Sequence, residues 1–161
     1  MSAKTPRNLS RLLALLSIAL FAGISLYLLP LEPNLLALQF SFTPDAFQAV
    51  IAQWQGDGLQ RFKWHFWADF ALLLCYGLWG YQWVHTAAWL KHGSYPNALA
   101  WLLPLAAIAD ALENLLQLYL LGQSAALTLL YPLAAMAALL KWLLLMLFAL
   151  CLGWAWSRRQ R

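Results

Sequence analysis

Four long apolar segments take up most of this chain, at about residues 12–30, 64–90, 98–121 and 127–156. Each is long enough for the roughly 20 helical residues that cross about 30 Å of hydrocarbon. A chain of 161 residues that is 63% hydrophobic and 10% charged does not have the composition of a soluble domain. The pattern therefore predicts an all-α polytopic membrane protein, residues 1–161, in which four transmembrane helices form one antiparallel bundle.

The first apolar segment resembles a signal peptide because the basic residues Lys4, Arg7 and Arg11 precede it. It is longer than the usual apolar core of a signal peptide, and it runs into the stretch 29-LPLEP-33 without a small-x-small cleavage site. We therefore expect it to be retained as the first membrane helix.

Lys and Arg residues outside the apolar segments are distributed unevenly, and this distribution predicts the topology. Most of them lie before the first segment, between the second and third at Lys91, and at the chain end at Arg158, Arg159 and Arg161. The outward segment also holds Arg61 and Lys63, which Glu32, Asp45 and Asp57 offset. Cytoplasmic flanks carry the excess of basic residues, so both termini should be cytoplasmic and 31–62 should face outward. The net charge of +4 mostly reflects this asymmetry, and a nucleic-acid partner is not expected.

The outward segment contains a predicted short helix at about 44–55. Thr43 has the position of an N-cap, Pro44 that of the first helical residue, and Gly56 follows the end. Its apolar side chains fall on one stripe, which comprises Phe47, Val50, Ile51 and Trp54. Such a stripe predicts an interfacial helix. Two alternatives are a linker packed on the bundle and a lid over an outward opening.

Polar residues inside the apolar segments mark the candidate site. In the third segment, Asp110, Glu113, Asn114 and Gln117 recur at spacings that place them on one helix face. At about 1.5 Å rise per residue, Asp69 in the second helix and Lys141 in the fourth reach similar depths. His65 and Tyr76 share the face of Asp69. The predicted cluster, which is a ligand-binding site or a buried polar cluster, comprises His65, Asp69, Tyr76, Asp110, Glu113, Asn114, Gln117 and Lys141.

Charge in this cluster does not balance, because three acids accompany one certain cation, Lys141. Ionised groups at such depth should face the interior and pair with one another, so Lys141 should contact Asp110 or Glu113. The remaining charge implies that His65 is protonated, that one carboxyl is neutral, or that something positive is bound. A purely structural ion pair that fixes helix register is the alternative.

Gly77 and Gly80 would let a neighbouring helix or a ligand come close.

Several kinds of chemistry have no sequence pattern here. The chain lacks a Gly-rich phosphate loop, a nucleophile elbow and the Cys/His spacing of zinc or iron–sulfur sites. Cys75 and Cys151 are expected to be packing residues, and Trp142 is too deep for an interfacial belt and is expected to pack between helices. We expect no cofactor and no metal. A single hard cation held by Asp69, Asp110 and Glu113 is an alternative, although Lys141 would compete for the same oxygens.

The motifs 69-DF-70 with Tyr76 and 110-DALEN-114 resemble a type of small uncharacterised bacterial four-helix inner-membrane protein. These proteins have a long first outer loop, an Asp-Phe and a tyrosine on helix two, and an Asp-x-x-Glu-Asn on helix three. The resemblance implies a coherent intramembrane site and a location in the bacterial inner membrane. Acidic residues inside a helical bundle also look like lipid enzymes of the sterol-isomerase type, which is an analogy at the level of fold.

Three functional classes are compatible with these features. The first is a binding module whose outward-facing polar cavity holds an amphipathic or lipid-like ligand. The second is an accessory or structural subunit of a larger membrane complex, and the third is a membrane enzyme that uses carboxylate acid/base chemistry on a lipid-like substrate. The partners expected are membrane lipid, an amphipathic small molecule, and partner membrane subunits or a second copy of the chain. The catalytic residues of the third class are not identified by the sequence.

Overall fold

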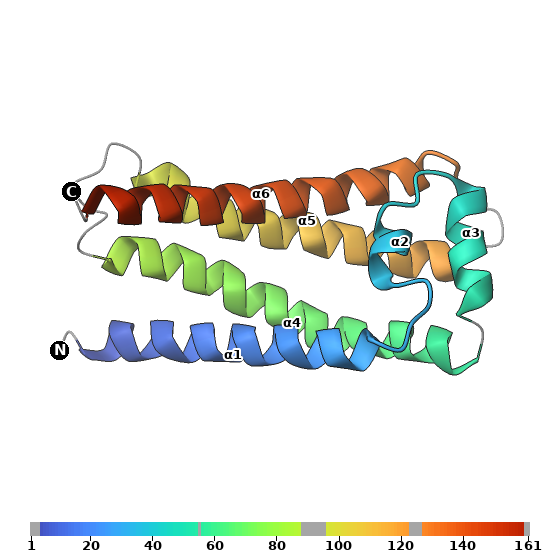
Figure 1. Cartoon of the computed structure of the whole chain (residues 1–161), viewed down its shortest axis with the longest axis horizontal. Helices are drawn as coiled ribbons and strands as arrows, with labels where there is room; N and C mark the ends of the chain where they lie inside the picture. The colour runs from blue at the N-terminus through green and yellow to red at the C-terminus, as the bar shows by residue number, and fades with distance from the viewer. Residues whose placement is uncertain (1–3, 55, 88–95, 123–126, 160–161) are drawn as a thin grey trace.

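A computed structural model describes residues 4–54, 56–87, 96–122 and 127–159 (Figure 1). Its helices are α1 (Lys4–Leu28), α2 (Leu35–Gln39), α3 (Pro44–Gln53), α4 (Asp57–Thr86), α5 (Pro96–Gly122) and α6 (Leu130–Arg159). The described ranges contain no strand, which confirms the all-α prediction. Lys91, Arg161 and the predicted end of the second helix at residue 90 lie outside these ranges.

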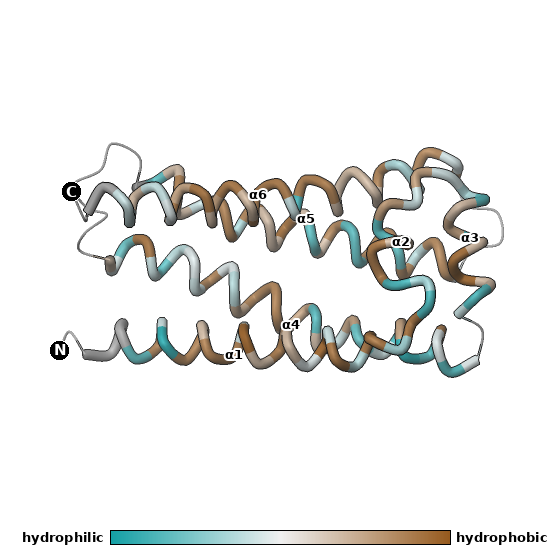
Figure 2. Tube along the Cα trace, in the orientation of Figure 1, coloured by the Kyte–Doolittle hydropathy of each residue, from teal (hydrophilic) through white to brown (hydrophobic). Residues whose placement is uncertain are grey.

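Among the residues that the structure describes, three helices are long and apolar enough to cross a membrane: Asn8–Leu28, Asn97–Gly122 and Leu130–Ser157. Many of their large apolar side chains are exposed, among them Ile18, Ile108 and Leu143. Figure 2 shows apolar residues along most of α1 and α6, and more polar ones in α3 and at the start of α4. The surface of the bundle therefore has the character of a membrane protein, in which exposed apolar side chains face hydrocarbon rather than water.

The four long helices lie lengthwise and follow one another in an antiparallel order (Figure 1). α1 packs against α4, α4 against α5, and α5 against α6. No extensive contact joins the described parts of α1 and α6. The bundle is consequently an open one, with a gap between its first and last long helices.

Glycine residues let α4 approach α5 closely. A Cβ atom added at Gly80 would lie 2.5 Å from Leu103 Cδ1, and one added at Gly77 would lie 3.2 Å from Ala107 Cβ. This confirms the prediction that these glycines admit a close neighbour, and it identifies that neighbour as α5. Small buried residues of α6, such as Ala138, serve the α5–α6 contact in the same way.

α3 covers one end of the bundle (Figure 1). The Thr43 hydroxyl accepts a hydrogen bond from the Ala46 amide at 3.2 Å, so the N-cap was predicted correctly. Phe47, Val50 and Trp54 of the predicted stripe are buried. They pack in an apolar cluster with residues of α1, α4, α5 and α6. The apolar stripe of α3 thus lies against protein, and the helix packs on the bundle.

The two largest differences from the predicted helix bounds have a shared reason. α1 begins at Lys4 and α4 at Asp57, several residues before the apolar segments that were used to predict them. Hydropathy marks where a helix enters hydrocarbon, whereas the backbone remains helical in water beyond that point. The polar first turns of α4 are held to α1 by Arg61, which lies 5.4 Å from the ring centre of Tyr27.

Substitution of Gly80 tests the close packing of α4 on α5. Gly80→Ala should lower the melting temperature in detergent, because the new methyl group overlaps Leu103 and overpacking costs about 1–3 kcal/mol. Gly23→Ala in α1 is the matched control, since nothing lies within 4 Å of its added Cβ. Equal melting temperatures for the two variants would contradict the predicted contact.

Candidate functional site

Lys141 forms the centre of the polar cluster. Its Nζ lies 2.8 Å from Asp110 Oδ1 and 2.6 Å from Glu113 Oε2. All three side chains are buried, and Glu113 is completely inaccessible to solvent. The predicted pairing of Lys141 with Asp110 or Glu113 is confirmed, and it involves both acids. The three-residue spacing on α5 is what places the two carboxylates side by side before one ammonium group on α6.

Further hydrogen bonds connect this ion pair to α4 and to the next turn of α5. The Tyr76 hydroxyl donates to Asp110 Oδ2 at 3.2 Å, and Gln117 Nε2 donates to Glu113 Oε1 at 2.8 Å. Asn114 Nδ2 donates to Asp69 Oδ2 at 2.5 Å. Seven of the eight predicted residues therefore make polar contacts with one another, and these contacts join α4, α5 and α6.

His65 is the predicted member that does not bond to this group. Its ring packs against those of Phe62 and Phe66, with centroid distances of 5.0 and 4.3 Å. Its Nδ1 atom contacts the Phe62 carbonyl oxygen. His65 is buried, as predicted, but it is part of the aromatic packing at the end of the bundle that α3 covers.

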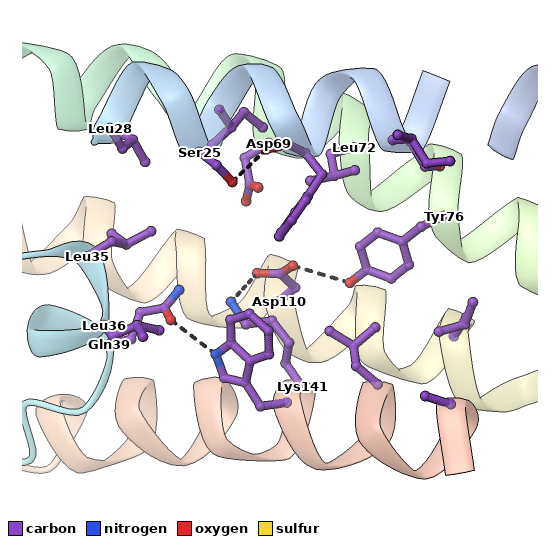
Figure 3. A pocket seen from close by; sticks show the side chains of 18 of the residues that line it. Ser25, Leu28, Leu35, Leu36, Gln39, Asp69, Leu72, Tyr76, Asp110 and Lys141 are labelled. Carbon is purple, nitrogen blue, oxygen red and sulfur yellow. Dashed lines mark hydrogen bonds and ion pairs between the residues drawn. The ribbon is translucent and has the colours of Figure 1, made fainter. Parts of the chain in front are cut away.

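A cavity of about 780 Å³ lies between α1 and α6, with α4 and α5 behind it and α2 at one end (Figure 3). Most of its wall is apolar, from residues such as Phe21, Leu72 and Leu145. Its ionisable lining residues are Asp69, Tyr76, Asp110 and Lys141. Asp69 and Asp110 point toward one another from α4 and α5 (Figure 3).

The polar face of α5 is divided between this cavity and the helix interfaces. Asp110 lines the cavity, whereas Glu113, Asn114 and Gln117 are buried beside it and bond to other side chains. We expected all four to line one cavity that faces outward. The difference arises because the later turns of α5 approach the apolar cluster under α3, where the long helices close together. The cavity is instead open along the gap between α1 and α6.

α2 closes the gap between α1 and α6 at the end next to α3 (Figure 1). Its Gln39 is buried, and Trp142 Nε1 of α6 donates a hydrogen bond to Gln39 Oε1 at 3.1 Å. α2 is not predictable from periodicity, because five residues are too few for a periodic pattern. A local signal exists in Asn34, whose side chain caps α2 by accepting from the Ala37 amide at 3.3 Å.

Asp69 is the carboxylate that remains without a cation. The ion pairs of the described residues join Lys141 to Asp110 and to Glu113, and none reaches Asp69. Lys141 Nζ occupies the space between two acids in which a hard cation would otherwise lie. Within the part of the chain that the structure describes, no group of three His, Cys, Asp or Glu side chains has an arrangement that would hold a metal ion.

Comparison with protein-family models, curated proteins and solved structures finds no match to this chain. The function is therefore argued from the geometry of the site.

Replacement of Lys141 tests the ion pair. Lys141→Met should lower the melting temperature strongly, because removing one partner of a buried pair leaves uncompensated charge and costs about 3–5 kcal/mol. Combining it with Glu113→Gln and Asp110→Asn should recover much of this loss. If Lys141→Met melts like the wild type, the ammonium group is held by water or lipid headgroups rather than by these acids.

Proposed function

We propose that the chain is a multi-pass protein of the bacterial inner membrane in which α4 is a fourth transmembrane helix. α4 lies antiparallel between α1 and α5, both of which are apolar enough to span. Its segment 66–84 contains one charged residue, Asp69, and is roughly 28 Å long at 1.5 Å per residue. That length matches the hydrocarbon layer of a bilayer.

The proposed orientation has both termini in the cytoplasm. α1 begins and α6 ends at one end of the bundle, and α3 lies at the other (Figure 1). The sequence has most of its basic residues at the first of these ends, which is the arrangement expected of cytoplasmic flanks, whereas Arg61 and Lys63 lie at the other end. α3 and the start of α4 would then face the periplasm.

Cysteine labelling in intact cells tests this orientation. A cysteine introduced by Asp57→Cys, at the start of α4, should react with a membrane-impermeant maleimide, and one introduced by Gln160→Cys should not. The wild type, whose native Cys75 and Cys151 lie inside the helices, gives the background level of labelling. Labelling of the Gln160→Cys variant alone would show that the protein is inserted in the opposite direction.

We propose that this protein binds an amphipathic or lipid-like molecule in the cavity between α1 and α6. The cavity volume of about 780 Å³ is within the range of roughly 300–1,000 Å³ that is typical of small-molecule sites. Its apolar wall suits a hydrocarbon chain, and its few polar groups suit a headgroup. The observation that carries the proposal is this cavity and its position against the polar cluster.

The gap between α1 and α6 gives the ligand a route from the bilayer. Ile18 and Phe21 of α1 line the cavity, and both are also largely exposed on the surface. The hydrocarbon chain of a ligand could therefore move from the surrounding lipid into the cavity without crossing water. The opening thus lies at the side of the bundle, whereas α2 and α3 cover the periplasmic end.

A purely structural role for the polar cluster accounts for only part of it. Glu113 is buried beside the cavity and is paired with Lys141 and with Gln117, as a structural ion pair requires. Asp69 and Tyr76 instead line a cavity, where unfilled space gives no packing energy. An occupant of the cavity would supply the contacts that these two side chains lack.

An enzyme that acts on the bound molecule is the second candidate. Asp69 and Asp110 line the same cavity from two helices and point toward one another, which is an arrangement suited to a general acid and a general base. The two candidates differ in outcome, because an enzyme would convert its bound molecule and a binding protein would release it unchanged.

Filling the cavity tests binding. Leu145→Trp places a larger side chain into the cavity and should abolish copurification of a small molecule detected by mass spectrometry of solvent extracts. Leu147→Trp, on an exposed part of α6 away from the cavity, is the matched control and should retain it. If both variants and the wild type carry the same molecules, the cavity is not the binding site. A copurifying protein without any bound small molecule would favour an accessory subunit instead.

A further inference from the structure

The carboxylates of Asp69 and Asp110 accept hydrogen bonds from neighbouring side chains of the protein. Lys141 donates to Asp110, Tyr76 donates to Asp110, and Asn114 donates to Asp69. The indole N–H of Trp142 donates to Gln39. Asp69 Oδ1 accepts none of these bonds, so it can accept a hydrogen bond from a ligand.

The formal charges of the cluster also favour a ligand that donates hydrogen bonds. Lys141 is shared by Asp110 and Glu113, and Asp69 has an amide but no cation as a partner among the described residues. Counted at their formal charges, three carboxylates and one ammonium group leave an excess of negative charge in this buried cluster. A ligand with a positive headgroup would reduce this excess, whereas an anionic headgroup would add to it.

Aromatic rings line the cavity next to these carboxylates. Tyr76, Trp79 and Trp142 contribute to its wall, and Lys141 Nζ already lies 5.4 Å from the ring centre of Trp142. Aromatic faces attract ammonium groups, and the attraction is strongest where water is excluded. The amides of Asn34 and Gln39, at the α2 end, are neutral and do not offset the negative charge.

We infer that the cavity between α1 and α6 binds an amphiphile with an ammonium headgroup, which pairs with Asp69 while its hydrocarbon chain lies against the apolar wall. This inference rests on the proposed binding function and specifies the headgroup. The ammonium group donates to Asp69 and lies against the aromatic wall. The hydrocarbon chain of the ligand extends along α1 and α6 toward Phe148 and Leu152, at the far end of the cavity.

Three amphiphiles with the same chain and different headgroups test the inference. Dodecylammonium, dodecanol and dodecanoate are added at one mole fraction to the protein in micelles of a non-ionic detergent, and the melting temperature is recorded. A ligand that binds the folded state raises the melting temperature. We expect dodecylammonium to raise it most and dodecanoate least.

Asp69→Asn should weaken the response to dodecylammonium at least about tenfold in apparent affinity. The variant should remain folded, because an amide oxygen at this position can still accept from Asn114. Asp45→Asn, which removes an exposed carboxylate of α3, is the matched control for overall charge and should respond like the wild type.

Leu145→Trp separates the headgroup inference from the proposed function. If dodecanoate or dodecanol stabilises the wild type as well as dodecylammonium does, and Leu145→Trp removes the response, the cavity binds amphiphiles but the ammonium inference is wrong. An equal response of Asp69→Asn and wild type to dodecylammonium also overturns it. If Leu145→Trp responds like the wild type to all three, or none of the three stabilises the wild type, the proposed binding function fails together with the inference.

Discussion

The ion pair of Lys141 with Asp110 and Glu113 is the interaction on which the rest of the structure depends. In a medium without water, neither the ammonium nor the carboxylates can remain unpaired, so α5 and α6 must keep the register that brings them together. Tyr76 attaches α4 to the same group through Asp110. No described side chain of α1 is bonded to this cluster. The extensive packing of α1 is against α4.

This asymmetry produces the cavity. Three helices are fixed around the polar cluster, while the first helix is held by packing against only one of them. The space between α1 and α6 is closed at one end by α2 and by the bond from Trp142 to Gln39, and it remains open toward lipid along its length. Asp69 lines this space and has no cation as a partner among the described residues. The same shortage of positive charge therefore links the packing of the bundle to the chemistry of the proposed ligand.

Helix-face spacing and depth were sufficient to predict the buried cluster. A pairing of Lys141 with Asp110 or Glu113 follows because charged groups in hydrocarbon pair with one another, and the structure has both pairs. The gap between α1 and α6 was not predictable in this way, since periodicity within one helix does not say which helices pack together. α2 is too short for a periodic signal, and its contact with Trp142 links residues 103 positions apart. His65 shares the face of Asp69, yet the rings of Phe62 and Phe66 hold it in the apolar cluster.

The most direct measurement is an experimental map of the protein in a lipid nanodisc, with a bound antibody fragment to add mass. It should show α1 and α6 apart, with elongated density between them that ends within about 4 Å of the Asp69 carboxylate, a distance typical of an ion pair. A map in which α1 packs directly onto α6, so that their side chains fill the space beside Asp69, would contradict the existence of a binding cavity.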